Sequence, residues 1–398
     1  MSPGARECLG EIGVTEETKS RATARRGKHV KIRAAVLREV KKGYSIEELE
    51  LEPPHAGEVL VKYAYTGYCH SDLSNAMGRI QMALPMVAGH ECAGVVEAVG
   101  PGVTRVKVGD HVVGTWMIPC GHCPECRRGL GNVCTGNFTH FVSGTMLDGT
   151  TRMRDVKGKP VLHGNFVSGF SDRTVVPEGG LVPVRKDMPL DWAAIMSCCI
   201  PTGWGSVTKM ANVRPGDKVA VWGLGGVGQN ILRAAKMRQA NPLIAVDLEE
   251  SRRAQALELG ATHFICNAKD DPVPIIQDLT GGGVDFAFEA SGDPGAIVQS
   301  WWTLAMAGRL MVVGIMPQDQ VAELPLTFMA LQQKSIIGTL YGSVSVQDDI
   351  PRLCDLAMTG EMKLDKIVEG KFKLEDLNDI AEKMEKRQLG GRWVCEWD

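Results

Sequence analysis

The chain has 398 residues, which exceeds the size at which one hydrophobic core keeps growing, so we expect two domains. Hydrophobic residues make up 44% of the chain and charged residues 23%, proportions that are ordinary for a soluble globular protein. The net charge of −3 gives no electrostatic reason to expect nucleic acid or an anionic membrane as a partner. No stretch approaches the roughly 18 apolar residues of a membrane-spanning helix.

The first 31 residues are polar and mixed in charge, and they lack the apolar core of a secretory signal. Four glutamates in this segment also argue against an organellar transit peptide, which is poor in acids. We therefore interpret residues 1–31 as a flexible N-terminal extension. Twelve cysteines in a chain without an export signal indicate metal ligands and buried thiols in a reducing compartment. The predicted location is the cytoplasm.

From residue 32 onward, short apolar or alternating runs predict β-strands at 34–37, 57–68 and 93–100. Stretches rich in Gly and Pro at 51–58 and 99–110 separate these runs. The pattern is typical of a compact barrel of short strands.

Four cysteines follow within fifteen residues, in the spacing C-x2-C-x2-C-x7-C. Four thiolates brought together by short loops can close a tetrahedral shell around Zn²⁺, and a closed shell stabilises a fold without performing chemistry. An iron–sulfur cluster is the rival interpretation, but the bacterial ferredoxin run places its fourth cysteine after three residues and follows it with proline. Here the gap before the fourth cysteine is seven residues. The spacing therefore predicts a structural zinc site at Cys120, Cys123, Cys126 and Cys134.

After the four-cysteine run the sequence pattern changes twice. Residues 136–180 are glycine-rich and are expected to form a long irregular loop. From about Asp217, strands are predicted at 218–223, 243–247, 263–266, 284–289, 309–314 and 334–340, with helices at 227–238, 251–260 and between most other strands. This alternation favours a doubly wound parallel sheet of the α/β class. The tail at 391–398 ends in a predicted strand that could return to the first domain.

A dinucleotide site is predicted where the first of these strands meets its helix. Gly223, Gly225 and Gly228 have the spacing G-x-G-x-x-G, which permits a tight turn, close approach of the backbone to a pyrophosphate and close packing of helix on strand. Asp247 ends the next strand, where a carboxylate accepts hydrogen bonds from ribose and repels a 2′-phosphate, so NAD is favoured over NADP. Arg252 lies near enough to accept such a phosphate. The predicted loop residues are Gly223, Gly225, Gly226, Val227 and Gly228.

Three further metal-ligand candidates lie outside the four-cysteine run: Cys69, His90 and Cys198. Two thiolates and an imidazole suit Zn²⁺ and leave a fourth position open. The sequence separation of these residues is too large for spacing alone to join them, and Cys199 is a rival for Cys198.

These motifs together resemble the zinc-dependent medium-chain alcohol dehydrogenase family. The resemblance runs from about residue 32 to residue 398, through GYCHSD, GHE, the four-cysteine run, PTGWGS, GLGGVG and GATH. Within that family the chain most resembles the nicotinoprotein, nitroso-dye-linked (NDMA-type) branch, through GTMLDGTTR and PTGWGS. The family resemblance implies a GroES-like β-barrel catalytic domain at 32–198 and 342–398, with a structural-zinc lobe at about 115–135. A Rossmann NAD-binding domain would occupy 199–341.

The resemblance also implies a role for each candidate near the catalytic metal. Cys69, His90 and Cys198 would hold a catalytic zinc ion, and Glu91 would be a transient ligand behind it. Asp72 would accept the second ring N–H of His90 and so fix its tautomer.

Other implied roles concern the proton, the cofactor and the substrate. Ser71 would take the alcohol proton, and His70 and Arg392 would contact the pyrophosphate. Ser74 stands where many relatives have the histidine that ends the proton relay, so a shorter relay is expected here. The implied substrate pocket contains Trp116 and Ile80.

The function that follows is hydride transfer between an alcohol and NAD, with zinc polarising the substrate oxygen. Three alternatives stay open: a nicotinoprotein that retains NAD and passes electrons to an external acceptor, a non-catalytic protein that binds NAD and zinc, and a glutathione-linked formaldehyde dehydrogenase. The last needs a cationic pocket, whereas the implied pocket is apolar. We expect two zinc ions per chain, a small alcohol, aldehyde or ketone as substrate, and a homodimer or homotetramer with the strand at 334–340 at the contact.

Overall fold

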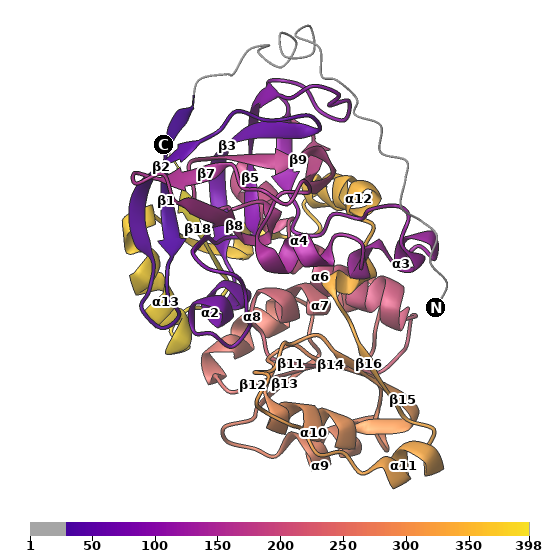
Figure 1. Ribbon diagram of the computed structural model, residues 1–398. Coiled ribbons are helices and arrows are strands. Elements are labelled where there is room, and N and C mark those ends of the chain that lie inside the picture. Colours follow the sequence, from indigo (N-terminus) through magenta and orange to yellow (C-terminus); the bar gives the residue numbers. More distant parts are fainter. Residues whose placement is uncertain (1–28, 398) are drawn as a thin grey trace, which may run out of the picture.

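The computed structural model describes residues 29–397 and places them in two parts (Figure 1). One part contains the N-terminal strands together with the C-terminal segment, and the other contains a parallel sheet covered by helices. The expected extension at 1–31 lies outside the described residues except at its end, where the first strand already begins at Val30. Across residues 29–397, we find no helix with the length and apolarity to span a bilayer.

A closed barrel opens the fold, with the strand order β1-β2-β7-β8-β4. The strands are short, and closure is what satisfies the backbone groups along their edges. Ile32, Val36 and Leu49 are among the side chains that fill its core. The barrel strands are β1 (Val30–Leu37), β2 (Ser45–Leu51), β4 (Met86–Val87), β7 (Met153–Asp155) and β8 (Pro160–His163).

The expectation of an irregular loop at 136–180 was wrong in part. This segment contains α4 (Phe138–Ser143), β7, β8 and β9 (Arg173–Pro177). The strands of three or four residues are too short to show an alternating pattern, so their conformation is set by pairing within the barrel. Arg152 is fully buried here and bridges the carboxylates of Glu58 and Asp148, at 2.6 Å from each.

A second sheet lies beside the barrel, in the order β10-β6-β5-β3-β18-β17, with β9 also pairing with β3. The C-terminal strand β18 pairs with β3, as Val394 opposite Gly67 shows. The end of the chain therefore returns to the first part of the fold. The strands are β3 (Glu58–Tyr68), β5 (Glu91–Val99), β6 (His111–Gly114), β10 (Leu181–Val184), β17 (Val368–Phe372) and β18 (Arg392–Glu396).

The other part is a six-stranded parallel sheet in the order β13-β12-β11-β14-β15-β16, with helices on both faces. The predicted doubly wound α/β class is confirmed, and all six predicted strands are present. Their bounds are β11 (Val219–Trp222), β12 (Leu243–Asp247), β13 (His263–Cys266), β14 (Val284–Glu289), β15 (Leu304–Val312) and β16 (Ser335–Gly338).

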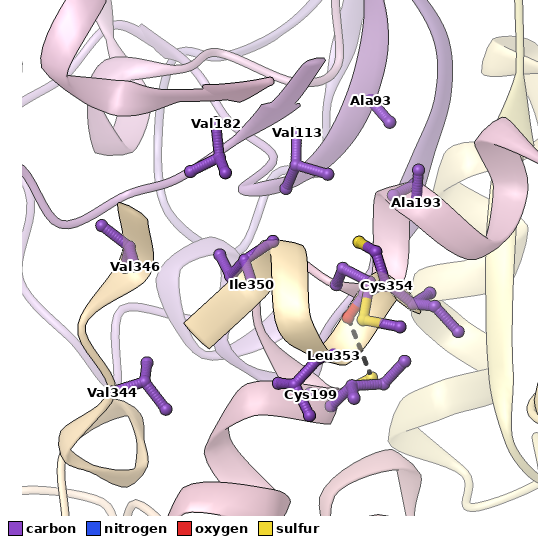
Figure 2. Packing of buried hydrophobic residues seen from close by; sticks show 14 of the residues in the cluster. Ala93, Val113, Val182, Ala193, Cys199, Val344, Val346, Ile350, Leu353 and Cys354 are labelled. Atoms are coloured by element: carbon purple, nitrogen blue, oxygen red, sulfur yellow. Dashed lines mark hydrogen bonds between the residues drawn. The ribbon is translucent and has the colours of Figure 1, made fainter. Parts of the chain in front are cut away.

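Helices cover both sheets and join the two parts. Val344, Val346 and Ile350, at and before α12, pack with Val113 and Val182 of the second sheet (Figure 2). The remaining helices are α2 (His70–Ala76), α3 (Pro124–Arg127), α5 (Leu190–Ile195), α6 (Cys199–Gly205), α7 (Gly226–Met237), α8 (Arg253–Glu258), α9 (Pro272–Thr280), α10 (Pro294–Trp302), α11 (Leu326–Leu331), α12 (Val346–Met358) and α13 (Leu377–Glu385).

Candidate metal centre and dinucleotide site

The three scattered ligand candidates meet in one place. Cys69, His90 and Cys198 are buried with Glu91, and one ligand atom of each lies within 4.8 Å of the others. Cys199 does not belong to this group, since its thiol points back toward the Ile195 carbonyl, with Sγ 3.7 Å from the oxygen. The structure therefore brings Cys198, and not Cys199, into this group.

A helix start fixes two members of this group. Cys69 follows β3 and caps α2, and its backbone N–H donates to Asp72 Oδ2 at 3.0 Å. The other oxygen of Asp72 lies 3.1 Å from His90 Nδ1. A carboxylate in this position orients the ring and directs its Nε2 toward a metal. Asp72 is fully buried, so one side chain sets the geometry of both candidate ligands.

The electrostatics fit a cation. Cys69 and Cys198 share a hydrogen bond, which together with the nearby Arg392 and His90 charges holds the pKa of the Cys69 thiol well below its usual range. The same hydrogen bond and burial raise the pKa of Cys198. Burial lowers the pKa of His90, but Asp72 and Cys69 outweigh it and raise that pKa well above its usual value. The protons held by the Cys198 thiol and the His90 ring are those that a bound metal ion would displace.

Arg392 connects this group to the dinucleotide loop. Its Nε lies 2.9 Å from Glu91 Oε2 as an ion pair whose angle is not that of a hydrogen bond, and its Nη1 donates to the Tyr68 carbonyl at 3.2 Å. A Cβ placed on Gly226 would lie 2.8 Å from Arg392 Nη2. The guanidinium therefore touches the first residue of α7. Burial raises the pKa of Glu91 to about 7, against the opposing effect of Arg392.

The glycine loop has the conformation that its spacing predicted. Gly223 follows β11 with φ of +83°, and a Cβ on Gly228 would overlap the Gly223 carbonyl. A Cβ on Gly225 would meet only open space, which leaves the start of α7 accessible to an anion. Val227 is half-buried in the packing of α7.

Asp247 and Arg252 lie at the end of the neighbouring strand. Asp247 ends β12 and accepts the backbone N–H of Leu224 at 2.7 Å. The Arg252 guanidinium donates to the Leu389 carbonyl at 2.9 Å and lies 3.8 Å from Glu369, so it is engaged with the C-terminal segment.

The four-cysteine lobe forms a second compact group. One sulfur atom of each of the four residues lies within 4.8 Å of the others. The backbone N–H of Cys126 donates to Cys123 Sγ at 3.4 Å and is the main cause that lowers the pKa of Cys123 to about 5. Backbone N–H groups aimed at sulfur favour thiolates, which are the form that binds zinc.

The remaining predicted residues surround the metal group less closely. The hydroxyl of Ser71 lies 3.8 Å from Cys69 Sγ, and His70 is exposed at the start of α2. Ser74 is buried in the same helix. Trp116 packs against Tyr341 with the rings tilted and their centroids 4.5 Å apart, whereas Ile80 lines a separate hollow of about 320 Å³ that does not include Trp116.

Sequence reasoning did not identify two residues that contact this region. Tyr341 donates its hydroxyl to the Ser197 carbonyl, directly before Cys198. Phe141 lies 6.0 Å from Trp116 between ring centroids. Neither residue belongs to a motif with recognisable spacing. A third group of candidate ligands, His55, Glu58 and Asp148, is already occupied by the Arg152 guanidinium, which pairs with both carboxylates.

Comparisons with known proteins show the family of the chain. Residues 55–186 match the alcohol dehydrogenase GroES-like domain, and residues 226–359 match the zinc-binding dehydrogenase domain. An NDMA-dependent alcohol dehydrogenase from Amycolatopsis methanolica is 38% identical over 357 residues, which cover 88% of this chain and 95% of the relative.

Two solved structures are also similar. An alcohol dehydrogenase zinc-binding domain protein from Burkholderia ambifaria has a TM-score of 0.88 and 36% identity, covering 93% of this chain and all of its own. Benzyl alcohol dehydrogenase from Acinetobacter calcoaceticus has a TM-score of 0.87 and 33% identity with the same coverage. The chain therefore belongs to the zinc-dependent medium-chain alcohol dehydrogenases, in their NDMA-type branch, and is an NAD-dependent oxidoreductase that acts on alcohols.

Proposed function

We propose that Cys69, His90 and Cys198 hold a catalytic zinc ion at which an alcohol and its carbonyl product are interconverted. The observation that carries this proposal is the buried group of two thiols and one imidazole, with Arg392 leading from it to the start of α7. Three protein ligands leave the fourth zinc position free for a substrate oxygen. When bound, zinc supplies a Lewis acid for that oxygen and NAD accepts the hydride.

The surrounding residues orient the reactants and handle the proton. Asp72 holds His90 in the tautomer that presents Nε2. The hydroxyl of Ser71, beside Cys69, receives the alcohol proton. The buried Ser74 stands where relatives have a relay histidine, so the proton leaves by a shorter route toward solvent. Glu91 compensates the charge of Arg392 and stands behind the ligands as a transient fourth donor.

The loop from Gly223 to Gly228 binds the NAD pyrophosphate, with Arg392 and His70 at its sides. Open space at Gly225 and the free N–H groups of α7 support this assignment. Asp247 selects NAD over NADP, because the nearby Arg252 is engaged with Leu389 and Glu369.

A second zinc ion in the lobe at Cys120, Cys123, Cys126 and Cys134 has a structural role in this proposal. Its four sulfur ligands would leave no open position. All eleven cysteines among residues 29–397 are free thiols, which favours a reducing compartment such as the cytoplasm.

Metal content and activity, measured together, test the catalytic site. We expect wild-type protein to contain two zinc ions per chain and Cys69→Ser to contain one, with turnover lower by at least about 100-fold. Cys199→Ser is the matched control, because its thiol points to Ile195, and it should retain both metal ions and turnover. Unchanged activity in Cys69→Ser would refute the assignment.

The chain could retain its NAD as a nicotinoprotein. Its 38% identical relative is named for its dependence on NDMA, which favours this candidate. Arg252 and Gln255, which follow Asp247 in the chain, contact Glu369 in the C-terminal segment, so this side of the proposed site is joined to the other part of the fold. Denaturation of the purified protein distinguishes the two cases. One NAD per chain in the supernatant supports retention, and its absence excludes it.

The aromatic rings around Trp116 favour an aryl alcohol as substrate. Tyr341, Phe141 and Phe166 continue this group, with neighbouring centroids 4.5 to 6.2 Å apart. The structural relative that is a benzyl alcohol dehydrogenase supports the same class. A kinetic screen of aryl, ring and aliphatic alcohols, with NAD and with NDMA as acceptor, tests this substrate class.

We also propose that the chain forms a homodimer or homotetramer with β16 at the contact.

A further inference from the structure

A strained turn lies between the two parts of the molecule. Tyr341, Gly342 and Ser343 follow β16 and all have left-handed backbone conformations, with φ of 55°, 61° and 53°. Tyrosine and serine rarely adopt this conformation, because Cβ crowds the backbone. Such a turn persists only when its surroundings hold it in place, and strain of this kind gathers at functional sites.

Two contacts place the turn against α6 and the residue that follows this helix. A Cβ on Gly342 would lie 2.6 Å from the Pro201 carbonyl oxygen, so only glycine fits against α6. The hydroxyls of Ser206 and Thr339 lie 3.0 Å apart just before the turn. The turn therefore sits directly on the helix that follows the candidate ligand Cys198.

The four-cysteine lobe holds the turn from the other side. Asn132 lies two residues before Cys134 in a short 3-10 turn (η1, Gly131–Val133) and is 5% exposed. Its Nδ2 donates to the Leu340 carbonyl at 2.9 Å and to Ser343 Oγ at 3.4 Å. One buried amide therefore donates hydrogen bonds to the residue before the left-handed turn and to the last residue of the turn.

Tyr341 connects this turn to the candidate metal centre. Its hydroxyl donates to the Ser197 carbonyl, in the peptide that leads into Cys198, and its ring packs against Trp116 in a tilted arrangement. Ser197 is fixed further by hydrogen bonds between its hydroxyl and the backbone of Cys92, at 3.0 and 3.1 Å. A continuous path of polar contacts therefore runs from the four-cysteine lobe to the third candidate ligand.

We propose that Asn132 and Tyr341 are positioning residues, through which the four-cysteine lobe sets the placement of Cys198 and of the Trp116 ring. The proposal rests on the proposed function, because it takes Cys198 as a ligand of the catalytic metal. It gives the lobe a second role besides local stability. Neither residue belongs to the group of candidate ligands; each acts through a backbone carbonyl, and Tyr341 acts also through its ring against Trp116.

Cobalt substitution tests the path, since the absorption bands of tetrahedral Co²⁺ respond to ligand placement. The spectrum of cobalt-loaded Cys69→Ser, which retains only the lobe metal, is subtracted to isolate the catalytic cobalt. We expect Asn132→Ala and Tyr341→Phe each to shift these bands and to lower kcat/KM about three- to thirty-fold, mainly through kcat. The double variant should fall by less than the product of the single effects, since both act on one path.

Asn137→Ala is the matched control. Asn137 also lies beside the lobe and donates to a carbonyl, that of Ile118 at 2.8 Å, but it does not contact the turn. It should leave the cobalt bands and kcat unchanged. Tyr341→Phe retains the ring and supplies the test if Asn132→Ala fails to fold.

The outcomes separate the path from the function on which it depends. If wild-type protein shows no catalytic cobalt bands beyond those of Cys69→Ser, the proposed metal site is wrong and the path falls with it. If the wild-type bands are present and neither variant moves them, the path is refuted. A lower melting temperature of the variants in that case would show that the two residues only stabilise the fold. A shift in Tyr341→Phe alone would remove Asn132 and the lobe from it.

Discussion

The guanidinium of Arg392 and the carboxylate of Glu91 form a fully buried ion pair, with Nε and Oε2 2.9 Å apart, between the candidate zinc ligands and the start of α7. The two residues lie on β18 and β5, strands separated by β3 in one sheet. Breaking a buried pair from one side leaves an uncompensated charge, which is far more costly than removing both partners.

We therefore expect Glu91→Gln to lower the stability of the protein by about 3–5 kcal/mol. The double variant Glu91→Gln/Arg392→Met should be less destabilised than the sum of the single variants. Chemical denaturation monitored by fluorescence measures all three. Additive effects would show that the pair contributes no coupling energy.

This pair also shows how far sequence reasoning extends. The family resemblance implied a position behind the metal for Glu91 and one at the pyrophosphate for Arg392, but neither it nor the sequence indicated that the two residues touch. The strands β11 to β14 were predictable, because buried parallel strands have continuous apolar runs between helices. β7 and β8 were not, since three or four residues cannot display a period. Asn132 belongs to no chemical motif, and its role depends on a turn more than 200 residues away in the chain.

His163 predicts a pH dependence. Burial, aided by the charge of Arg152, lowers the pKa of His163 to about 3, and its Nε2 accepts the Arg152 backbone N–H at 3.2 Å. In the unfolded chain His163 binds a proton near pH 6.5, whereas in the folded chain it stays neutral down to about pH 3. The contribution to stability is therefore present above pH 6.5 and is lost at about 1.4 kcal/mol per pH unit as the pH falls toward 3.

Denaturation midpoints between pH 7 and pH 5 test this effect. We expect His163→Gln to be less stable at pH 7 but to lose stability less steeply with acid than wild-type protein. His263→Gln replaces an exposed histidine on β13 and should follow the wild-type slope. Parallel slopes for His163→Gln and wild-type protein would contradict the assignment.

Arg233 is an unusual cation on α7. It is 4% exposed, and its Nε, Nη1 and Nη2 have no hydrogen-bond partner within residues 29–397. Burial lowers its pKa to about 10. Because a buried charge without a partner is costly, Arg233→Met should be neutral or stabilising by about 1–4 kcal/mol.

Thermal melts of Arg233→Met and of a second variant, at the C-cap residue Arg238 of α7, decide this prediction. Arg238 donates to the Val213 carbonyl at 2.8 Å, so Arg238→Met should lower the melting temperature. A clear loss of stability in Arg233→Met would instead indicate that Arg233 has partners such as bound water, or an anion, in solution.

We expect the chain to self-associate through the edge of the parallel sheet. β16 is its terminal strand, and the apolar residues Val321, Leu326 and Leu331 before it are 66–77% exposed. Exposed apolar side chains beside an open strand edge favour pairing with a second copy of the chain. Leu326→Glu/Leu331→Glu should therefore reduce the molecular mass measured by light scattering during gel filtration. Val156→Glu, a 76% exposed site in the turn between β7 and β8, should leave the mass unchanged. A wild-type mass of one chain, 43.0 kDa, at micromolar concentration would rule out this interface.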